Sequence, residues 1–194
     1  MENKSLIFIV SGPGGVGKTT LLKRLFLRKI IKQNFVQSVS MTTRKKRFGE
    51  KEGKDYFFVS KEYFEKKLKA GSFLESEKVL DDYYGTPKSC YDQALKSGKS
   101  LVLCIDVKGG MYLKKKVNLG RIVTIFIAPP QKAELKKRLE KREEKKTTIK
   151  NRVKLAKQEM SYAREYDYVL VNKKLTDSLN LLEAYFLAEK FRRP

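Results

Sequence analysis

The chain has 194 residues, of which 41% are hydrophobic and 11% aromatic, and this size favours one folded domain over two. It contains no histidine, which excludes Ser-His-Asp and Cys-His catalysis and histidine-ligated metals, and its two cysteines, Cys90 and Cys104, provide neither a disulfide framework nor zinc spacing. The net charge of +22 allows a polyanionic partner such as nucleic acid, although a lysine-rich, solvated surface is the favoured interpretation. No apolar run approaches the roughly 20 residues of a membrane helix and the N-terminus lacks the features of a signal peptide, so we expect a cytoplasmic protein without membrane association.

The first predicted elements surround a glycine-rich loop. Residues 6–10 form a continuous apolar run, which is typical of a buried strand, and they lead into Ser-Gly-Pro-Gly-Gly. Over residues 19–31, apolar side chains recur at helical spacing. Short strand signals follow at 35–40 and 56–59, and residues 61–70 predict a helix that ends at the next glycine.

The second half of the chain alternates strand-length apolar runs with charged or amphipathic segments, which favours a parallel sheet covered on both faces. A helix is predicted from Pro87 to residue 97, because proline suits a first turn and Gly98 a C-terminal stop. Residues 41–87 interrupt the alternation and are interpreted as an insertion in a single domain over residues 1–194. The other predicted elements are strands over 101–105, 122–127 and 168–171, and helices over 132–142, 149–166 and 175–190.

The glycine-rich loop fits the phosphate-binding pattern G-x-x-x-x-G-K-[ST]. Its glycines let successive backbone N–H groups face a phosphate without side chains between them. Lys18 places a charge on the β and γ oxygens, and the Thr19 hydroxyl can ligate Mg²⁺. Motors, GTPases, transporters and kinases share this loop, so it predicts the donor and not the reaction. With the next residue, Thr20, the predicted ATP-binding loop consists of Gly12, Pro13, Gly14, Gly15, Val16, Gly17, Lys18, Thr19 and Thr20.

Two further groups of residues are suited to a phosphorylated acceptor. Arg44 and Arg47 are three residues apart in a polar segment, and their forked guanidinium groups can bind one phosphate from two directions. Tyr84 and Thr86 place a phenol and a hydroxyl on either side of a glycine. Considered alone, the arginines are more typical of a solvated surface and the tyrosine of packing.

The sequence closely resembles the guanylate kinase family over nearly its whole length. The pattern TTR-x-x-R-x-GE-x-x-G-x-DY is more specific than the phosphate loop, because among P-loop kinases it belongs to this fold family alone. The matching stretches occur in the family's order: GPGGVGKTTLLKRLF, SVSMTTRKKRFGEKEGKDYFFVS, SFLE, YYGTP, IDVKGG, IAPP and LKKRLEKR.

The resemblance implies an α/β P-loop NTPase fold, in which helices flank a parallel sheet of about residues 1–40, 88–137 and 153–194. It also implies a mixed GMP-binding insertion over about 41–87 and a helical lid over about 138–152. The implied reaction transfers the γ-phosphoryl group of Mg-ATP to GMP, and to dGMP, giving ADP and GDP.

Site roles follow from the same resemblance, residue by residue. Arg44, Arg47, Tyr56 and Tyr84 match positions that bind the GMP phosphate. Glu75 matches the carboxylate that accepts hydrogen bonds from the guanine N1–H and 2-amino group. Ser40 and Thr86 match positions that address the guanine O6, and Asp106 matches an acid near GMP and the metal. Asn172 matches a position near the adenine, and Thr19 the Mg²⁺ ligand. The residues that match catalytic positions are Lys18, Arg44 and the three lid arginines Arg138, Arg142 and Arg152.

Three departures from the family pattern affect these expectations. Cys104 stands where many members carry a carboxylate, so a second acidic group near Mg²⁺ is missing at this position and Asp106 is left as the main one. Gly14 replaces a common serine, and the lid is about one residue shorter and more basic than usual. An inactive protein-binding module, a nucleic-acid-binding P-loop protein and a kinase for another phosphorylated acceptor remain alternatives, as do a monomer and a homodimer.

Overall fold

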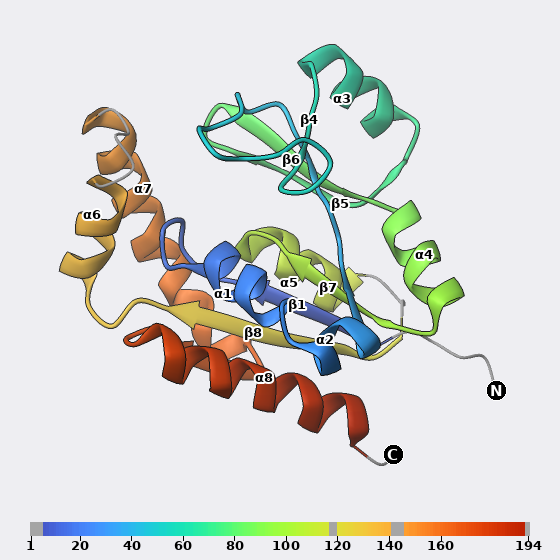
Figure 1. Ribbon diagram of the computed structural model, residues 1–194. Helices are drawn as coiled ribbons and strands as arrows, with labels where there is room; N and C mark the ends of the chain where they lie inside the picture. Colours follow the sequence, from blue (N-terminus) through green and yellow to red (C-terminus); the bar gives the residue numbers. More distant parts are fainter. Residues whose placement is uncertain (1–5, 117–119, 141–145, 193–194) are drawn as a thin grey trace.

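The computed structural model describes residues 6–116, 120–140 and 146–192. Its centre is a sheet of five parallel strands in the order β2-β7-β1-β8-β9 (Figure 1). Each strand is short and apolar, and β1 lies in the middle, with Ile9 beside Leu103 on one side and Thr124 on the other. The strands are β1 Ile7–Ser11, β2 Phe35–Gln37, β7 Ser100–Cys104, β8 Ile122–Ala128 and β9 Tyr168–Val171.

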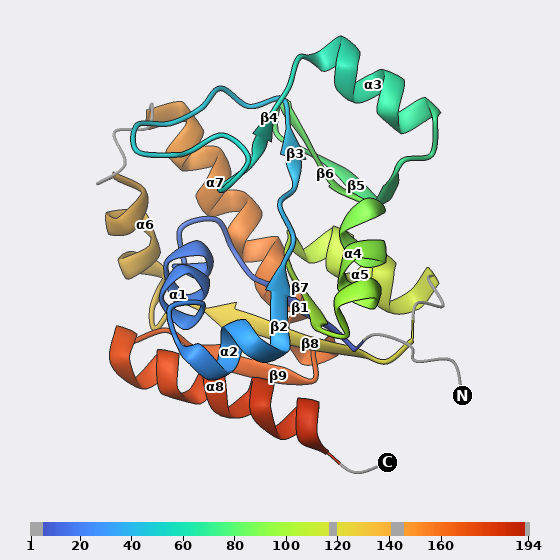
Figure 2. The same cartoon turned by 45° about the vertical axis from the view of Figure 1, so that its right-hand side comes forward.

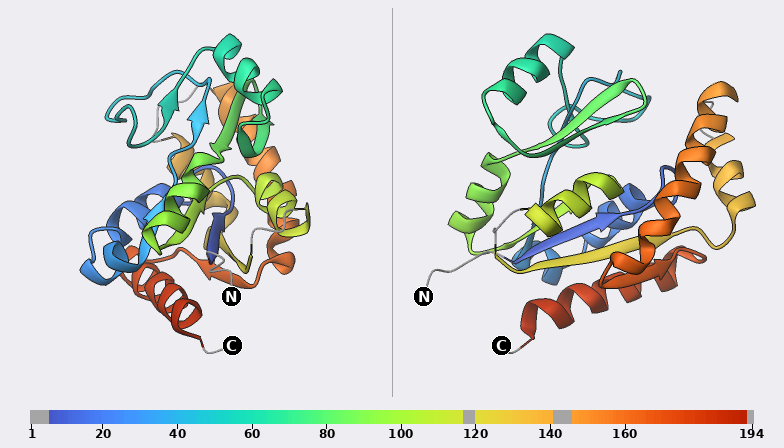
Figure 3. Two further views of the ribbon diagram at one scale, coloured as in Figure 1. Left: turned by 90° about the vertical axis from the view of Figure 1, so that its right-hand side faces the viewer. Right: turned by 180° about the vertical axis from the view of Figure 1, so that it is seen from behind.

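Helices cover both faces of this sheet, as predicted. Figure 3 shows two sets of helices on opposite faces of the sheet. Because side chains alternate along a strand, Phe8 and Val10 belong to the cluster packed under one set, and Ile7 and Ile9 to the cluster under the other. All four side chains are fully buried. The first set is α1 Lys18–Leu25, α2 Lys29–Asn34 and α8 Leu175–Phe191, and the second is α4 Ser89–Ser97 and α5 Val107–Lys116.

A second sheet of four strands, in the order β4-β3-β6-β5, stands apart from the first (Figures 1 and 2). The helix α3, Lys61–Lys69, packs on it through Phe64, whose ring stacks on Phe73 at 4.7 Å and on Tyr83 at 5.5 Å between centroids. The hairpin β5–β6 turns at Leu80, which has a positive φ of 58°. The strands are β3 Met41–Thr42, β4 Phe57–Phe58, β5 Phe73–Val79 and β6 Asp82–Pro87.

Two helices, α6 Lys132–Glu140 and α7 Lys146–Glu159, form an arm at one end of the molecule (Figure 1). The helix predicted over 149–166 ends earlier, because its last turn tightens into a 3-10 segment, Met160–Glu165. The predicted catalytic residue Arg142 lies outside the described residues. No helix in the three described segments is long and apolar enough to cross a membrane.

Two other predicted elements differ from the structure, and one helix was not predicted. The single helix over 19–31 is two helices, because Leu27 and Arg28 make tight i→i−3 bonds and Arg28 then becomes extended, with its guanidinium bound to Glu183 of α8. Pro87 ends β6, and the N–H of Lys88 still bonds Ser72, so α4 begins at Ser89. The helix α5 was missed because its two adjacent glycines weaken the helical pattern.

Candidate active site

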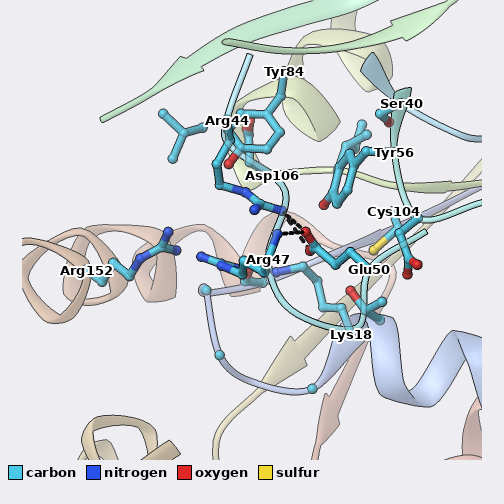
Figure 4. Close-up of a pocket in the computed structure, with 18 of the residues that line it drawn as sticks. Lys18, Ser40, Arg44, Arg47, Glu50, Tyr56, Tyr84, Cys104, Asp106 and Arg152 are labelled. Carbon is cyan, nitrogen blue, oxygen red and sulfur yellow. Dashed lines mark hydrogen bonds and ion pairs between the residues drawn. The ribbon is translucent and has the colours of Figure 1, made fainter. Parts of the chain in front are cut away.

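A cavity of about 940 Å³ lies between the phosphate loop, the second sheet and α7. Four cationic side chains from three segments point toward one part of it: Lys18 from the start of α1, Arg44 and Arg47 from the segment after β3, and Arg152 from α7 (Figure 4). Such a convergence of positive charge is suited to polyphosphate. The predicted site residues that line the cavity are Gly12, Gly14, Gly15, Gly17, Lys18, Thr19, Thr20, Ser40, Arg44, Arg47, Tyr56, Glu75, Tyr84, Asp106 and Arg152.

The phosphate loop adopts a conformation that only glycine accommodates easily. Gly12, Gly15 and Gly17 have φ values of 138°, 96° and 101°. A side chain at Gly12 would also overlap the carbonyl of Ile127 in β8. The Lys18 ammonium folds back over the loop, donating to the carbonyl of Gly12 and, at 3.1 Å, to that of Pro13. The loop's own carbonyls therefore hold the lysine ammonium against the loop.

Asn172 and Arg138 brace this loop from outside the cavity. The amide of Asn172 donates to the carbonyl of Val16 at 2.7 Å, and Arg138 donates to the same oxygen at 3.2 Å. Arg138 also donates to the Asn172 carbonyl at 3.2 Å. Asn172 is 5% exposed, and neither side chain lines the cavity. In this structure both residues contact the loop backbone and fix its shape.

Arg152 lies against the phosphate loop from the opposite side. A Cβ on Gly14 would lie 3.0 Å from its Nη1. The absence of a side chain at Gly14, where the family commonly has serine, leaves room for this guanidinium. Gly14 thus contributes space as well as a backbone N–H.

Glu50 organises the two arginines of the second sheet. Its carboxylate accepts two bonds from one Arg44 nitrogen, at 2.8 and 3.1 Å, and one from the Arg47 N–H at 2.8 Å (Figure 4). Burial raises the pKa of Glu50, but these donors outweigh it and hold the pKa below its usual range. The Arg44 guanidinium also lies over the Tyr56 ring, 5.5 Å from its centroid, and Tyr56 meets Tyr84 edge to face at 6.0 Å. The arginine fork is thereby held by charge on one side and by an aromatic ring on another.

A buried carboxylate lies at another part of the cavity. Glu75 is 5% exposed and accepts a hydrogen bond from Thr86 at 2.7 Å, and the Thr86 hydroxyl lies 3.4 Å from that of Ser40. Burial, together with the charge of Asp106, raises the pKa of Glu75 to about 7. A buried carboxylate of this kind is stabilised most by a ligand that donates hydrogen bonds to it. Thr86 does not line the cavity and contacts it through Glu75 and Ser40, which both do.

Two more acids lie near Lys18. Asp106 follows β7 and caps α5, accepting from the N–H of Gly109 at 2.8 Å. Burial raises its pKa and that of Glu159 on α7, and Lys18 opposes both shifts. Among the described residues, one carboxylate oxygen of Glu159 is buried without a hydrogen-bond partner. Burial also raises the pKa of the Cys104 thiol, so this side chain does not supply the negative charge of a carboxylate.

Comparison with known proteins identifies the family. The guanylate kinase family model matches residues 4–189. The chain belongs to the guanylate kinase family. Guanylate kinases of Aster yellows witches'-broom phytoplasma (strain AYWB) and Mycoplasma genitalium are both 44% identical over 97% of this chain, covering 89% and 78% of their own lengths. The crystal structure of guanylate kinase from Anaplasma phagocytophilum has a TM-score of 0.77 and 31% identity, covering 99% of this chain and 89% of that one.

Within this guanylate kinase site, the structure also brings in residues that the sequence analysis did not select. Glu50 lies in the GE pair of the family pattern, and that pair was the available signal. The side chain of Asp55, from the DY pair of the same pattern, is 5% exposed and forms an ion pair with Lys23 of α1, which ties the second sheet's loop to the helix after the phosphate loop. Phe48 lines the cavity although it is fully exposed, and Glu159 had no signal in the sequence alone.

Proposed function

We propose that this chain transfers the γ-phosphoryl group of Mg-ATP to GMP, and to dGMP, giving ADP and GDP. The observation that carries the acceptor assignment is the buried carboxylate of Glu75 at the cavity, bonded to Thr86 with Ser40 beyond it. Guanine presents two adjacent donors, N1–H and the 2-amino group, and a carboxylate can accept both. Adenine lacks this pair and would leave the carboxylate unpaired, and sites of that kind discriminate by about 10⁴.

The acceptor phosphate is proposed to bind between Arg44, Arg47, Tyr56 and Tyr84. Two guanidinium groups give bidentate contacts to phosphate oxygens. Glu50 already holds the Arg44 fork and the Arg47 backbone in one arrangement, so less side-chain freedom is lost when the phosphate binds.

The donor triphosphate is proposed to bind on the phosphate loop. Loop N–H groups and the positive end of α1 face the phosphates, and Lys18 neutralises the β and γ oxygens. An anionic oxygen of the GMP phosphate attacks the γ-phosphorus while the bond to the ADP oxygen breaks, so no catalytic base is needed. Lys18, Arg44 and Arg152 stabilise the charge on the transferring group and hold donor and acceptor in line.

The side chains near Lys18 fit a magnesium ion. Mg²⁺ prefers oxygen ligands and usually keeps several waters beside one or two carboxylates and the substrate phosphates. The Thr19 hydroxyl, Asp106 and the unpartnered oxygen of Glu159 offer this chemistry, and the described residues contain no cluster that would hold a metal alone. When bound, the ion neutralises phosphate oxygens during transfer. We propose Thr19 as its direct protein ligand.

The second sheet and the lid residues have separate roles in the proposed reaction. The second sheet, over about 41–87, is proposed to hold GMP, and residues of about 138–152 to close as a lid that carries Arg138, Arg142 and Arg152. Asn172 is proposed to border the adenine while its amide holds the loop. ATP and GMP are proposed as the partners in preference to nucleic acid, and the mass measured in solution distinguishes a monomer from a homodimer.

Coupled ADP release with GMP, AMP, UMP or CMP as acceptor tests the function. GMP should be the preferred acceptor, and absence of turnover with GMP would overturn the proposal. Lys18→Ala should abolish transfer to every acceptor. Glu75→Ala should weaken GMP selectivity, so an equal loss with all acceptors would contradict its role toward guanine.

A further inference from the structure

Gly109, in the first turn of α5, lies directly behind the carboxylate of Glu75. A Cβ at residue 109 would lie 2.6 Å from Oε2 and 3.3 Å from Cδ of Glu75. The helix therefore presents bare backbone to the acid that the proposed function assigns to guanine. The neighbouring Gly110 faces other atoms: its Cβ would meet the hydroxyls of Tyr166 at 2.9 Å and Ser11 at 3.0 Å.

The backbone at Gly109 does not require glycine. Its φ is not among the positive values of this chain, and its N–H donates to Asp106 as an ordinary helix cap contact. Alanine is the better helix former by about 1 kcal/mol. The helix therefore favours alanine at this position, and the nearest atoms that a Cβ would meet there belong to Glu75 and Asp106.

We infer that Gly109 is a specificity-determining positioning residue, whose missing side chain leaves the space in which Glu75 meets the base of the acceptor. The inference rests on the proposed GMP kinase function. An alanine Cβ would require the carboxylate to retreat by about 0.8 Å, from 2.6 Å to the ordinary contact distance of 3.4 Å. The end of a glutamate side chain can make this movement, so the fold tolerates it. Two aligned hydrogen bonds from guanine to this carboxylate would not survive the same movement, because hydrogen bonds weaken steeply when their geometry is disturbed.

Gly109→Ala should raise the KM for GMP by about tenfold to a hundredfold, the loss expected when hydrogen bonds to a charged acceptor are misaligned. The kcat and the KM for ATP should change little, and the melting temperature should be equal or higher. Gly110→Ala is the matched control, because it makes the same helix change one residue away without touching Glu75. It should leave the ratio of GMP to AMP turnover unchanged.

A double-mutant cycle separates positioning from a general disturbance of the site. If Gly109 acts through Glu75, then Gly109→Ala should have no further effect on the GMP to AMP ratio in a Glu75→Ala background. An equal effect in both backgrounds, or an unchanged GMP KM in an enzyme that does phosphorylate GMP, would overturn the inference. A crystal structure of Gly109→Ala without nucleotide gives a readout independent of activity: an unmoved Glu75 carboxylate also overturns it, whether or not the chain proves to be a GMP kinase.

Discussion

Glu75→Gln should make the protein more stable at neutral and alkaline pH, because the native fold buries an ionisable acid there. Burial and Asp106 raise the pKa of Glu75 from 4.5 to about 7. A difference of about 2.5 pKa units, at about 1.4 kcal/mol each, corresponds to about 3 kcal/mol. Below pH 4.5 Glu75 holds its proton in both the folded and the unfolded chain, and the fold keeps this contribution of about 3 kcal/mol in full. The contribution is lost as the pH rises through 7, where the buried side chain must lose its proton. Glutamine keeps an amide oxygen for the Thr86 hydroxyl and carries no charge.

Urea denaturation of both proteins at about pH 4 and about pH 8, at one ionic strength, measures the effect. The variant should match the wild type at the lower pH and exceed it by about 3 kcal/mol of unfolding free energy at the higher pH. Glu65→Gln, at a side chain that is 44% exposed on α3, is the control and should show no such increase. A Glu75→Gln effect that is independent of pH, or a less stable variant at pH 8, would refute the reasoning. The same variant should lose GMP selectivity, because an amide cannot accept both guanine donors.

Three further outcomes are expected. Arg44→Lys should raise the KM for GMP at least about tenfold in steady-state assays, because an ammonium group cannot make the bidentate contacts of a guanidinium group. An unchanged KM would count against the assignment of Arg44 to the GMP phosphate. Asn172→Ala leaves the Val16 carbonyl with Arg138 alone, so urea denaturation should show a loss of about 1–3 kcal/mol together with a higher KM for ATP; full stability would mean that the brace is dispensable. Chelation of divalent ions with EDTA should abolish transfer while calorimetry still detects GMP binding, and transfer that persisted would exclude a magnesium role.

The central sheet was predictable because its three inner strands, β1, β7 and β8, are short, apolar and almost fully buried. Residues 101–105 and 122–127 carry that signal without help from their neighbours in space. The hairpin β5–β6 carried no such signal, because its polar face is made by residues that serve the cavity, including Glu75 and Tyr84. Elements under functional constraint lose the hydrophobic pattern on which sequence reasoning depends.

The site was predictable to the extent that short local patterns carry its chemistry. The phosphate loop could be interpreted from spacing alone, and the second sheet's residues only through the family resemblance. Neither the spacing nor the family resemblance predicted contacts between segments that are distant in the sequence. Examples are the ion pair of Lys23 with Asp55 and the space that Gly109 leaves for Glu75, 34 residues earlier in the chain.

The brace at the Val16 carbonyl has a consequence for synthesis of the protein. The loop that it fixes is translated well before its brace is complete, because Asn172 follows β9, 156 residues after Val16. A nascent chain that has not yet released β9 from the ribosome therefore has the phosphate loop without the amide that fixes it. We expect ATP affinity to appear late and abruptly during translation, so that incomplete chains do not sequester nucleotide.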